Sequence, residues 1–154
     1  MTPSELVASL IELMSKQKVQ EALELYHDDV DVCVEFGLPH RYEIKGKARL
    51  QALVTAVNEQ RQGQPARMYQ DISVEDLVIH QTTNPNIVIA EWTYRSRING
   101  ATVENPNIIV VECREGKVYR SRDYHNHVTR AVADGTLAAL IEAIRGMALP
   151  QDAQ

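Results

Sequence analysis

Four successive β-like segments in the second half of the chain limit the fold more than any other feature. Apolar and β-branched residues recur through each segment, at about 68–81, 87–97, 103–114 and 117–127. The separators are short and contain the turn-forming residues Asn, Pro and Gly. Segments joined by so few residues pair with their neighbours as hairpins. The sequence therefore predicts a curved, mostly antiparallel meander around one core.

Helical patterns lie on both sides of this meander. Thr2, Pro3 and Glu5 provide the cap and first turn of a helix that we expect to end at Ser15. The other expected elements are a second helix at 19–26, a strand at 30–36, a third helix after Gly46 and a last helix after Thr136. Helices segregated to one face of an antiparallel sheet give the α+β class.

Length and charge limit the partners of the chain. Its 154 residues fit one domain, which we place at 1–149, followed by a polar tail at 150–154. The net charge of −5, from 16 basic and 21 acidic residues, argues against nucleic acid or an anionic membrane as a partner. The chain has no apolar run that spans a bilayer and no basic-then-apolar signal at its start, so we expect a cytoplasmic protein. Cys33 and Cys113 are expected to be buried and reduced, with a single bridge as the alternative.

The last β-like segment contains the candidate catalytic residues. Alternation along a strand places Tyr119, Ser121, Asp123 and His125 on one face. Asp123 has two interpretations. It is either a structural residue, as a solvated edge-strand acid or the partner of a neighbouring arginine, or a general acid or base in an apolar pocket. In the second interpretation, Asp123 and His125 are the candidate catalytic residues.

The same face offers a candidate metal site if the strand continues to His127. Asp123, His125 and His127 then recur at every second position, and carboxylates and imidazoles are ligands of transition metals. Side chains two residues apart on a strand are separated by about 6.8 Å, which makes three ligands from one straight strand an awkward set. We therefore expect no metal and no other cofactor.

Alternation and helical spacing also predict the wall of a pocket for a small apolar molecule. The expected substrate-binding residues are Val32, Val34, Phe36, Leu53, Val57, Trp92, Tyr94 and Tyr119. An apolar cavity with a few convergent polar groups is the ordinary form of a small-molecule site. Each of these residues also has a core-packing interpretation, including Trp92, the single tryptophan of the chain.

Several motifs, in their order and spacing, resemble the SnoaL-like branch of the nuclear-transport-factor-2-like (NTF2-like) superfamily. They are the LYHDDV sequence at 25–30, the YEIKGKA sequence at 42–48, the Asn-Pro-Asn turn at 84–86 and the strand at 116–124. The resemblance covers about residues 6–128. It implies a cone-shaped α+β fold, a sheet wrapped around N-terminal helices, a deep apolar pocket and a homodimer.

The resemblance also implies a role for single positions. Asp123 lies where the SnoaL-like cyclases hold an acid/base aspartate. The base and the two oxyanion-binding groups of the ketosteroid isomerases, by contrast, fall at Val34, Leu10 and Ile109. Three apolar residues cannot perform that chemistry, which needs one base and two hydrogen-bond donors. The polar network of the limonene-type epoxide hydrolases is likewise replaced by apolar and aromatic residues.

Two hypotheses for function follow. In the first, the chain is an enzyme of isomerase, cyclase or dehydratase type, in which Asp123 moves a proton on an apolar, polycyclic, terpenoid or polyketide-like substrate. In the second, the chain is a non-catalytic homodimer whose pocket only binds a small apolar molecule. The acid at position 123 favours the first hypothesis, whereas the apolar residues at Leu10, Val34 and Leu53 favour the second.

Overall fold

The computed structural model describes residues 1–63 and 69–147, without the side chains of residues 61 and 62. Its helices are α1 (Pro3–Ser15), α2 (Val19–Leu23), α3 (Lys47–Gln62), α4 (His127–Asp134) and α5 (Leu137–Arg145). Its strands are β1 (Tyr26–Val34), β2 (Tyr42–Lys45), β3 (Gln70–Gln81), β4 (Ile87–Ile98), β5 (Ala101–Arg114) and β6 (Lys117–His125). The predicted α+β class is confirmed. The predicted tail at 150–154 lies outside the described residues.

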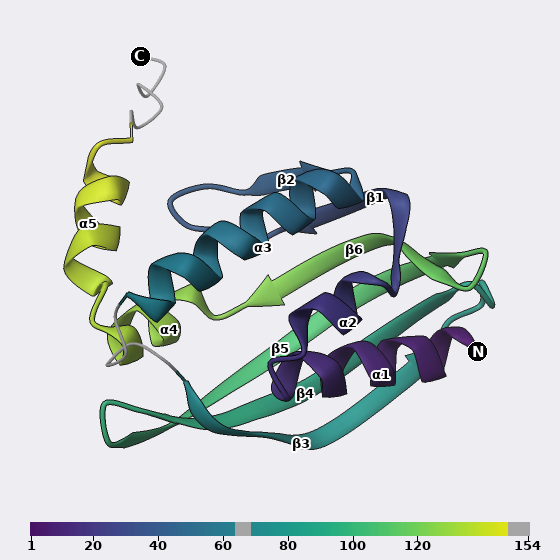
Figure 1. Cartoon of the computed structure of the whole chain (residues 1–154), viewed down its shortest axis with the longest axis horizontal. Coiled ribbons are helices and arrows are strands. Elements are labelled where there is room, and N and C mark those ends of the chain that lie inside the picture. The colour runs from purple at the N-terminus through teal and green to yellow at the C-terminus, as the bar shows by residue number, and fades with distance from the viewer. Residues whose placement is uncertain (64–68, 148–154) are drawn as a thin grey trace, which may run out of the picture.

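The strands form one curved sheet in the order β2-β1-β6-β5-β4-β3 (Figure 1). All neighbours pair antiparallel except β1 and β6, which pair parallel. The predicted meander is confirmed as β3 to β6. Its turns at Asn99-Gly100 and Glu115-Gly116 have positive φ at both residues, as two-residue turns that match the twist of a hairpin require.

Helix α1 covers the concave side of the sheet on β3 to β5, and α3 lies along β1 and β2 (Figure 1). A capping box between Thr2 and Glu5 begins α1, as the sequence predicts. The helix buries Leu6, Val7, Leu10 and Ile11 at helical spacing. These side chains form the main core together with apolar residues of β4 and β5. None of the described helices is long and apolar enough to cross a bilayer.

Some element boundaries differ from the prediction. The second helix ends at Leu23, so β1 begins at Tyr26 instead of residue 30. Strand β6 ends at His125, because the side chain of Asn126 accepts a hydrogen bond of 3.0 Å from the backbone N–H of Thr129 and caps α4. The sequence analysis missed α4. Both cysteines are buried, free thiols.

A bulge in β6 changes the predicted faces of that strand. Cys113 pairs with Val118, whereas Glu112, one residue before it, pairs with Arg120. One extra residue of β6 therefore lies between these pairs, and alternation reverses across it. Val118 is fully buried in the core, and Tyr119 packs instead against His27, with ring centroids 5.5 Å apart.

Candidate functional site

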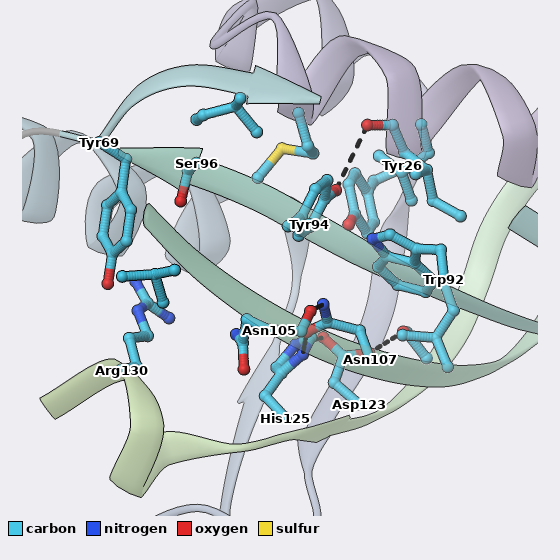
Figure 2. Close-up of a pocket in the computed structure, with 17 residues that line it drawn as sticks. Tyr26, Tyr69, Trp92, Tyr94, Ser96, Asn105, Asn107, Asp123, His125 and Arg130 are labelled. Carbon is cyan, nitrogen blue, oxygen red and sulfur yellow. Dashed lines mark hydrogen bonds and ion pairs between the residues drawn. The ribbon is translucent and has the colours of Figure 1, made fainter. Parts of the chain in front are cut away.

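A cavity of about 260 Å³ lies between α1 and the concave face of the sheet (Figure 2). Its apolar and aromatic lining residues are Leu10, Ile11, Met14, Tyr26, Tyr69, Ile72, Trp92, Tyr94, Val103 and Ile109. Its polar lining residues are Ser96, Asn105, Asn107, Ser121, Asp123, His125 and Arg130. A mostly apolar wall with a few convergent polar groups is the ordinary form of a small-molecule site.

Asp123 and His125 point into this cavity from β6, and each is oriented by a second contact (Figure 2). The Ser121 hydroxyl donates a hydrogen bond to Oδ1 of Asp123. The other carboxylate oxygen, Oδ2, lies 3.7 Å from Nε2 of His125. The side chains of Asp123 and His125 are 20% and 23% exposed, so the pair is shielded but accessible from the cavity. Among the described residues, Asp123 forms no ion pair with an arginine.

Asn107 determines which nitrogen of His125 is available for proton transfer. Its Nδ2 amide donates to the backbone carbonyl of Asn105 at 2.6 Å, which directs its Oδ1 oxygen toward His125. Nδ1 of His125 lies 2.5 Å from that oxygen and therefore carries a hydrogen. The free Nε2 faces Asp123 at a distance too long for a hydrogen bond. Both atoms therefore face the cavity without bonding to each other, and a ligand atom can contact either of them.

Aromatic residues of β4 and β1 form the opposite wall. The rings of Trp92 and Tyr94 meet edge to face with centroids 5.5 Å apart, and the Tyr94 hydroxyl donates to the carbonyl of Ile11 at 3.3 Å. Burial raises the pKa of Tyr94 to about 12, and the charge of Asp123 acts in the same direction. Burial, Asp123 and Tyr94 also raise the pKa of Tyr26. Both phenols therefore stay neutral at physiological pH.

Two buried polar atoms of the lining have no hydrogen-bond partner among the described residues. They are Nε1 of Trp92 and Oδ1 of Asn105. The indole N–H of Trp92 opposes the rise in the Tyr94 pKa without meeting the geometry of a hydrogen bond. Buried polar groups usually find a partner, so both atoms are positions at which a ligand can bond.

The three residues that the sequence analysis weighed as a candidate metal site do not form one cluster. His127 is the first residue of α4, and its ring centroid lies 6.1 Å from that of His125. Within residues 1–63 and 69–147, no group of three His, Cys, Asp or Glu side chains is placed to hold a metal ion.

Comparison with known proteins identifies the fold. No protein-family model and no curated protein sequence matches the chain. A candidate isomerase from Bacillus subtilis is 20% identical, with a TM-score of 0.68 over 88% of this chain and 97% of that chain. A candidate polyketide cyclase from Pseudomonas putida is 23% identical, with a TM-score of 0.67 over 87% and 98%. An NTF2-like protein from Burkholderia xenovorans is 19% identical, with a TM-score of 0.58 over 87% and 98%. The chain has the NTF2-like fold.

The NTF2-like fold brings together only part of the predicted site. Trp92, Tyr94, Asp123 and His125 line the cavity. They come from the central strands β4 and β6, whose concave face α1 covers without filling the space completely. Strict alternation along β4 and along the second half of β6 places these side chains on one face.

The other predicted substrate-binding residues lie elsewhere in the NTF2-like fold. Val32 and Val34 are buried on β1, over which α3 packs. Leu53 is 43% exposed and Val57 partly exposed, because α3 turns Leu50 and Val54 toward the core. Phe36 follows β1, is 65% exposed and packs against Tyr124 outside the cavity. The bulge removes Tyr119 from the inward face.

The sequence analysis also missed residues that line the cavity. Asn105 and Asn107 alternate with outward residues on β5, and this spacing could have indicated them. Tyr26 was assigned to a helix, and Arg130 lies on α4, which was not predicted. No local pattern identifies these last two as lining residues, because their positions depend on where β1 begins and β6 ends.

Proposed function

We propose that the protein is a small-molecule enzyme of isomerase or cyclase type, in which Asp123 and His125 move one proton on a largely apolar substrate. The observation that carries the proposal is the Asp123–His125 pair in a cavity with an otherwise mostly apolar wall. Paired groups that can exchange one proton beside a bound ligand are typical of general acid–base catalysis. The resemblance to SnoaL-like cyclases and the candidate isomerase and cyclase among the structural neighbours support this class.

The proton transfers of such a reaction use only this pair. The unprotonated member removes a proton from a substrate carbon next to a carbonyl, and the C–H electron pair moves into an enolate. In an isomerisation, the protonated member returns a proton at a second carbon. In a cyclisation, the enolate carbon bonds to a second carbonyl carbon, and the new alkoxide takes the proton. In both cases the proton and the charge balance within Asp123, His125 and the substrate.

The contacts around the pair support its role. Ser121 holds one oxygen of Asp123, and Asn107 holds one nitrogen of His125. Each group therefore presents its second polar atom to the cavity, at a separation of 3.7 Å. Groups fixed in this way need little reorganisation when the substrate reacts.

A non-catalytic ligand-binding protein is the second candidate function. Leu10 and Ile109, which fall where the ketosteroid isomerases hold oxyanion-binding groups, line the cavity as apolar side chains. The neutral donors among the described aromatic lining residues include the phenols of Tyr26 and Tyr94 and the indole N–H of Trp92, and Tyr94 already donates to Ile11. Weak stabilisation of an enolate would leave a pocket that binds its ligand without turnover.

The Asp123→Asn variant separates the two functions. Asparagine is nearly isosteric and can still accept a hydrogen bond from Ser121, so we expect the variant to fold and bind the same ligands. Loss of the proton-transferring carboxylate should lower turnover by roughly 10²- to 10⁴-fold. Asp29→Asn, at an exposed acid outside the cavity, is the matched control. Full turnover in Asp123→Asn would exclude the acid–base role, and no turnover by the wild type across carbonyl compounds that bind would favour the second function.

A further inference from the structure

Among the described residues, the lining of the cavity contains one guanidinium, which the proposed proton transfer does not use. Arg130 extends from α4 at the side of the cavity marked by Tyr69 and Ser96, whereas Asp123 and Trp92 lie farther along it (Figure 2). An arginine is charged at every physiological pH. The cavity therefore has a cationic region that is separate from its acid–base pair.

The charge of Arg130 has no counterion in the described part of the chain. Its guanidinium forms no hydrogen bond or ion pair there, although the side chain is partly buried. The acid one helical turn later, Asp134, accepts hydrogen bonds from the N–H of Thr136 at 3.1 Å and from its hydroxyl at 2.5 Å. The carboxylate best placed by helical spacing to neutralise Arg130 is thus bonded to another residue.

Unpartnered polar groups of the lining point to a ligand independently of Arg130. The side-chain oxygen of Asn105 is buried without a partner among the described residues, and Figure 2 places Asn105 between Arg130 and Asn107. Farther along, the buried Nε1–H of Trp92, a residue only 5% exposed, also lacks an acceptor. A donor group on a ligand would satisfy the Asn105 oxygen, and an acceptor would satisfy the Trp92 N–H; buried polar groups without partners are costly.

The volume of the cavity limits the apolar part of that ligand. An apolar protein cavity of roughly 150 Å³ holds benzene. A cavity of about 260 Å³ accordingly fits a body of about two rings, smaller than a four-ring steroid. An anionic group on such a body would be repelled by Asp123 and attracted by Arg130, so charge alone sets the direction in which it enters.

We propose that the ligand of this cavity is a carboxylic acid with a one- or two-ring apolar body, and that Arg130 binds its carboxylate. The guanidinium fork matches a carboxylate with two parallel hydrogen bonds. The rings then extend along Trp92 and Tyr94 toward Asp123 and His125. The inference rests on the proposed function in one respect, since both place the ligand in this cavity. It concerns binding alone and requires no turnover.

The test compares a two-ring acid with its neutral analogue. We would titrate the protein with 2-naphthoate and with 2-naphthamide and follow the fluorescence of Trp92, the single tryptophan of the chain, in the cavity wall. Wild type should bind the acid at least about 10-fold more tightly than the amide, since hydrogen bonds to charged groups exceed neutral ones by about that factor. Wild type that binds the acid no better than the amide, or binds neither, overturns the proposal.

Variants assign the preference to Arg130. Arg130→Met keeps the apolar stem and should abolish the preference for the acid, with Arg130→Gln as a second variant if the first does not fold. Arg49→Met, at an exposed arginine outside the cavity, is the matched control and should bind like wild type. An unchanged preference in a folded Arg130 variant also overturns the proposal.

The same titration separates this inference from the proposed function. Asp123→Asn should retain or strengthen binding of 2-naphthoate, because it removes a negative charge from the cavity. A preference for the acid without any turnover would uphold the carboxylate site and contradict the enzyme. Turnover of neutral carbonyl compounds without a preference for acids would uphold the enzyme and contradict the carboxylate site.

Discussion

Tyr94 is the residue for which burial has the clearest consequence for stability. Its hydroxyl is enclosed between α1 and β4 and bonds to the carbonyl of Ile11. Burial, with the Asp123 charge as a smaller contribution, raises the pKa of Tyr94 from 10.0 to about 12. Between these two values the folded protein holds a proton on Tyr94 that the unfolded chain releases. The associated stability is fully present below pH 10 and is lost as the pH rises toward 12.

The Tyr94→Phe variant should therefore lose less stability than wild type on going from pH 10 to pH 12. At neutral pH, we expect it to be about 0.5–1.5 kcal/mol less stable, because one hydrogen bond is removed. Urea unfolding measured across this pH range checks both expectations. Tyr119→Phe, at a tyrosine outside the cavity, is the control and should follow the wild-type curve. Equal alkaline slopes for Tyr94→Phe and wild type would contradict the assignment.

At the scale of elements, local sequence patterns predicted the architecture but not the details that determine the lining. Turn residues and apolar alternation identified β3 to β6, and the Thr2–Glu5 box identified α1. The bulge beside Tyr119 carries no distinct sequence signal, since it depends on how β6 pairs with both β5 and β1. Leu53 and Val54 follow Leu50 by three and four residues, and both spacings fit one face of a helix. Only packing on β1 decides which of the two side chains turns toward the core.

Helix α4 connects the end of β6 with the proposed carboxylate site. The Asn126 cap begins the helix directly after His125, and Arg130 follows about one turn later. Removing the cap in Asn126→Ala should cost about 0.5–2 kcal/mol of stability. It should also weaken binding of 2-naphthoate while leaving binding of 2-naphthamide unchanged, because frayed α4 no longer fixes the guanidinium.

Asn126→Asp is the matched control for this prediction, since aspartate caps helices as well as asparagine does. Urea unfolding gives the stability of both variants, and Trp92 fluorescence gives their binding. If Asn126→Ala lost affinity for the acid and the amide equally, the cap would act on the cavity as a whole and not through Arg130.

At the scale of the molecule, the two faces of the sheet have different surroundings. The concave face holds α1 and the cavity, whereas none of the described helices covers the opposite face of β4, β5 and β6 at Ile108. Asn107 and Ile109 line the cavity, so Ile108 points away from it by alternation. It is 43% exposed and pairs with Glu91 on one side and Tyr124 on the other.

This outer face supports the proposal of a homodimer, which the resemblance to NTF2-like proteins also implies. We define the outer patch as Val78, Ile108, Tyr124 and Phe36, of which Val78 is 45% and Phe36 65% exposed. Glu91 pairs with both Val78 and Ile108, so it lies within the patch, where it contacts His80 at 2.7 Å. A mix of exposed apolar side chains and polar groups that already have partners suits a two-fold interface, in which the same patch of each copy meets.

We therefore expect light scattering at micromolar concentration to give twice the chain mass of 17.4 kDa. Ile108→Asp should shift the mass to that of a single chain, since a two-fold axis would bring both new carboxylates into one apolar interface, where unpaired charges are costly. Ile144→Asp, at a 40% exposed position on α5, is the matched control and should remain dimeric. Because Ile108 and the cavity lie on opposite faces of β5, the monomeric variant should still bind 2-naphthoate. A wild-type mass of 17.4 kDa, or a dimer that survives Ile108→Asp, would rule out assembly through the outer patch.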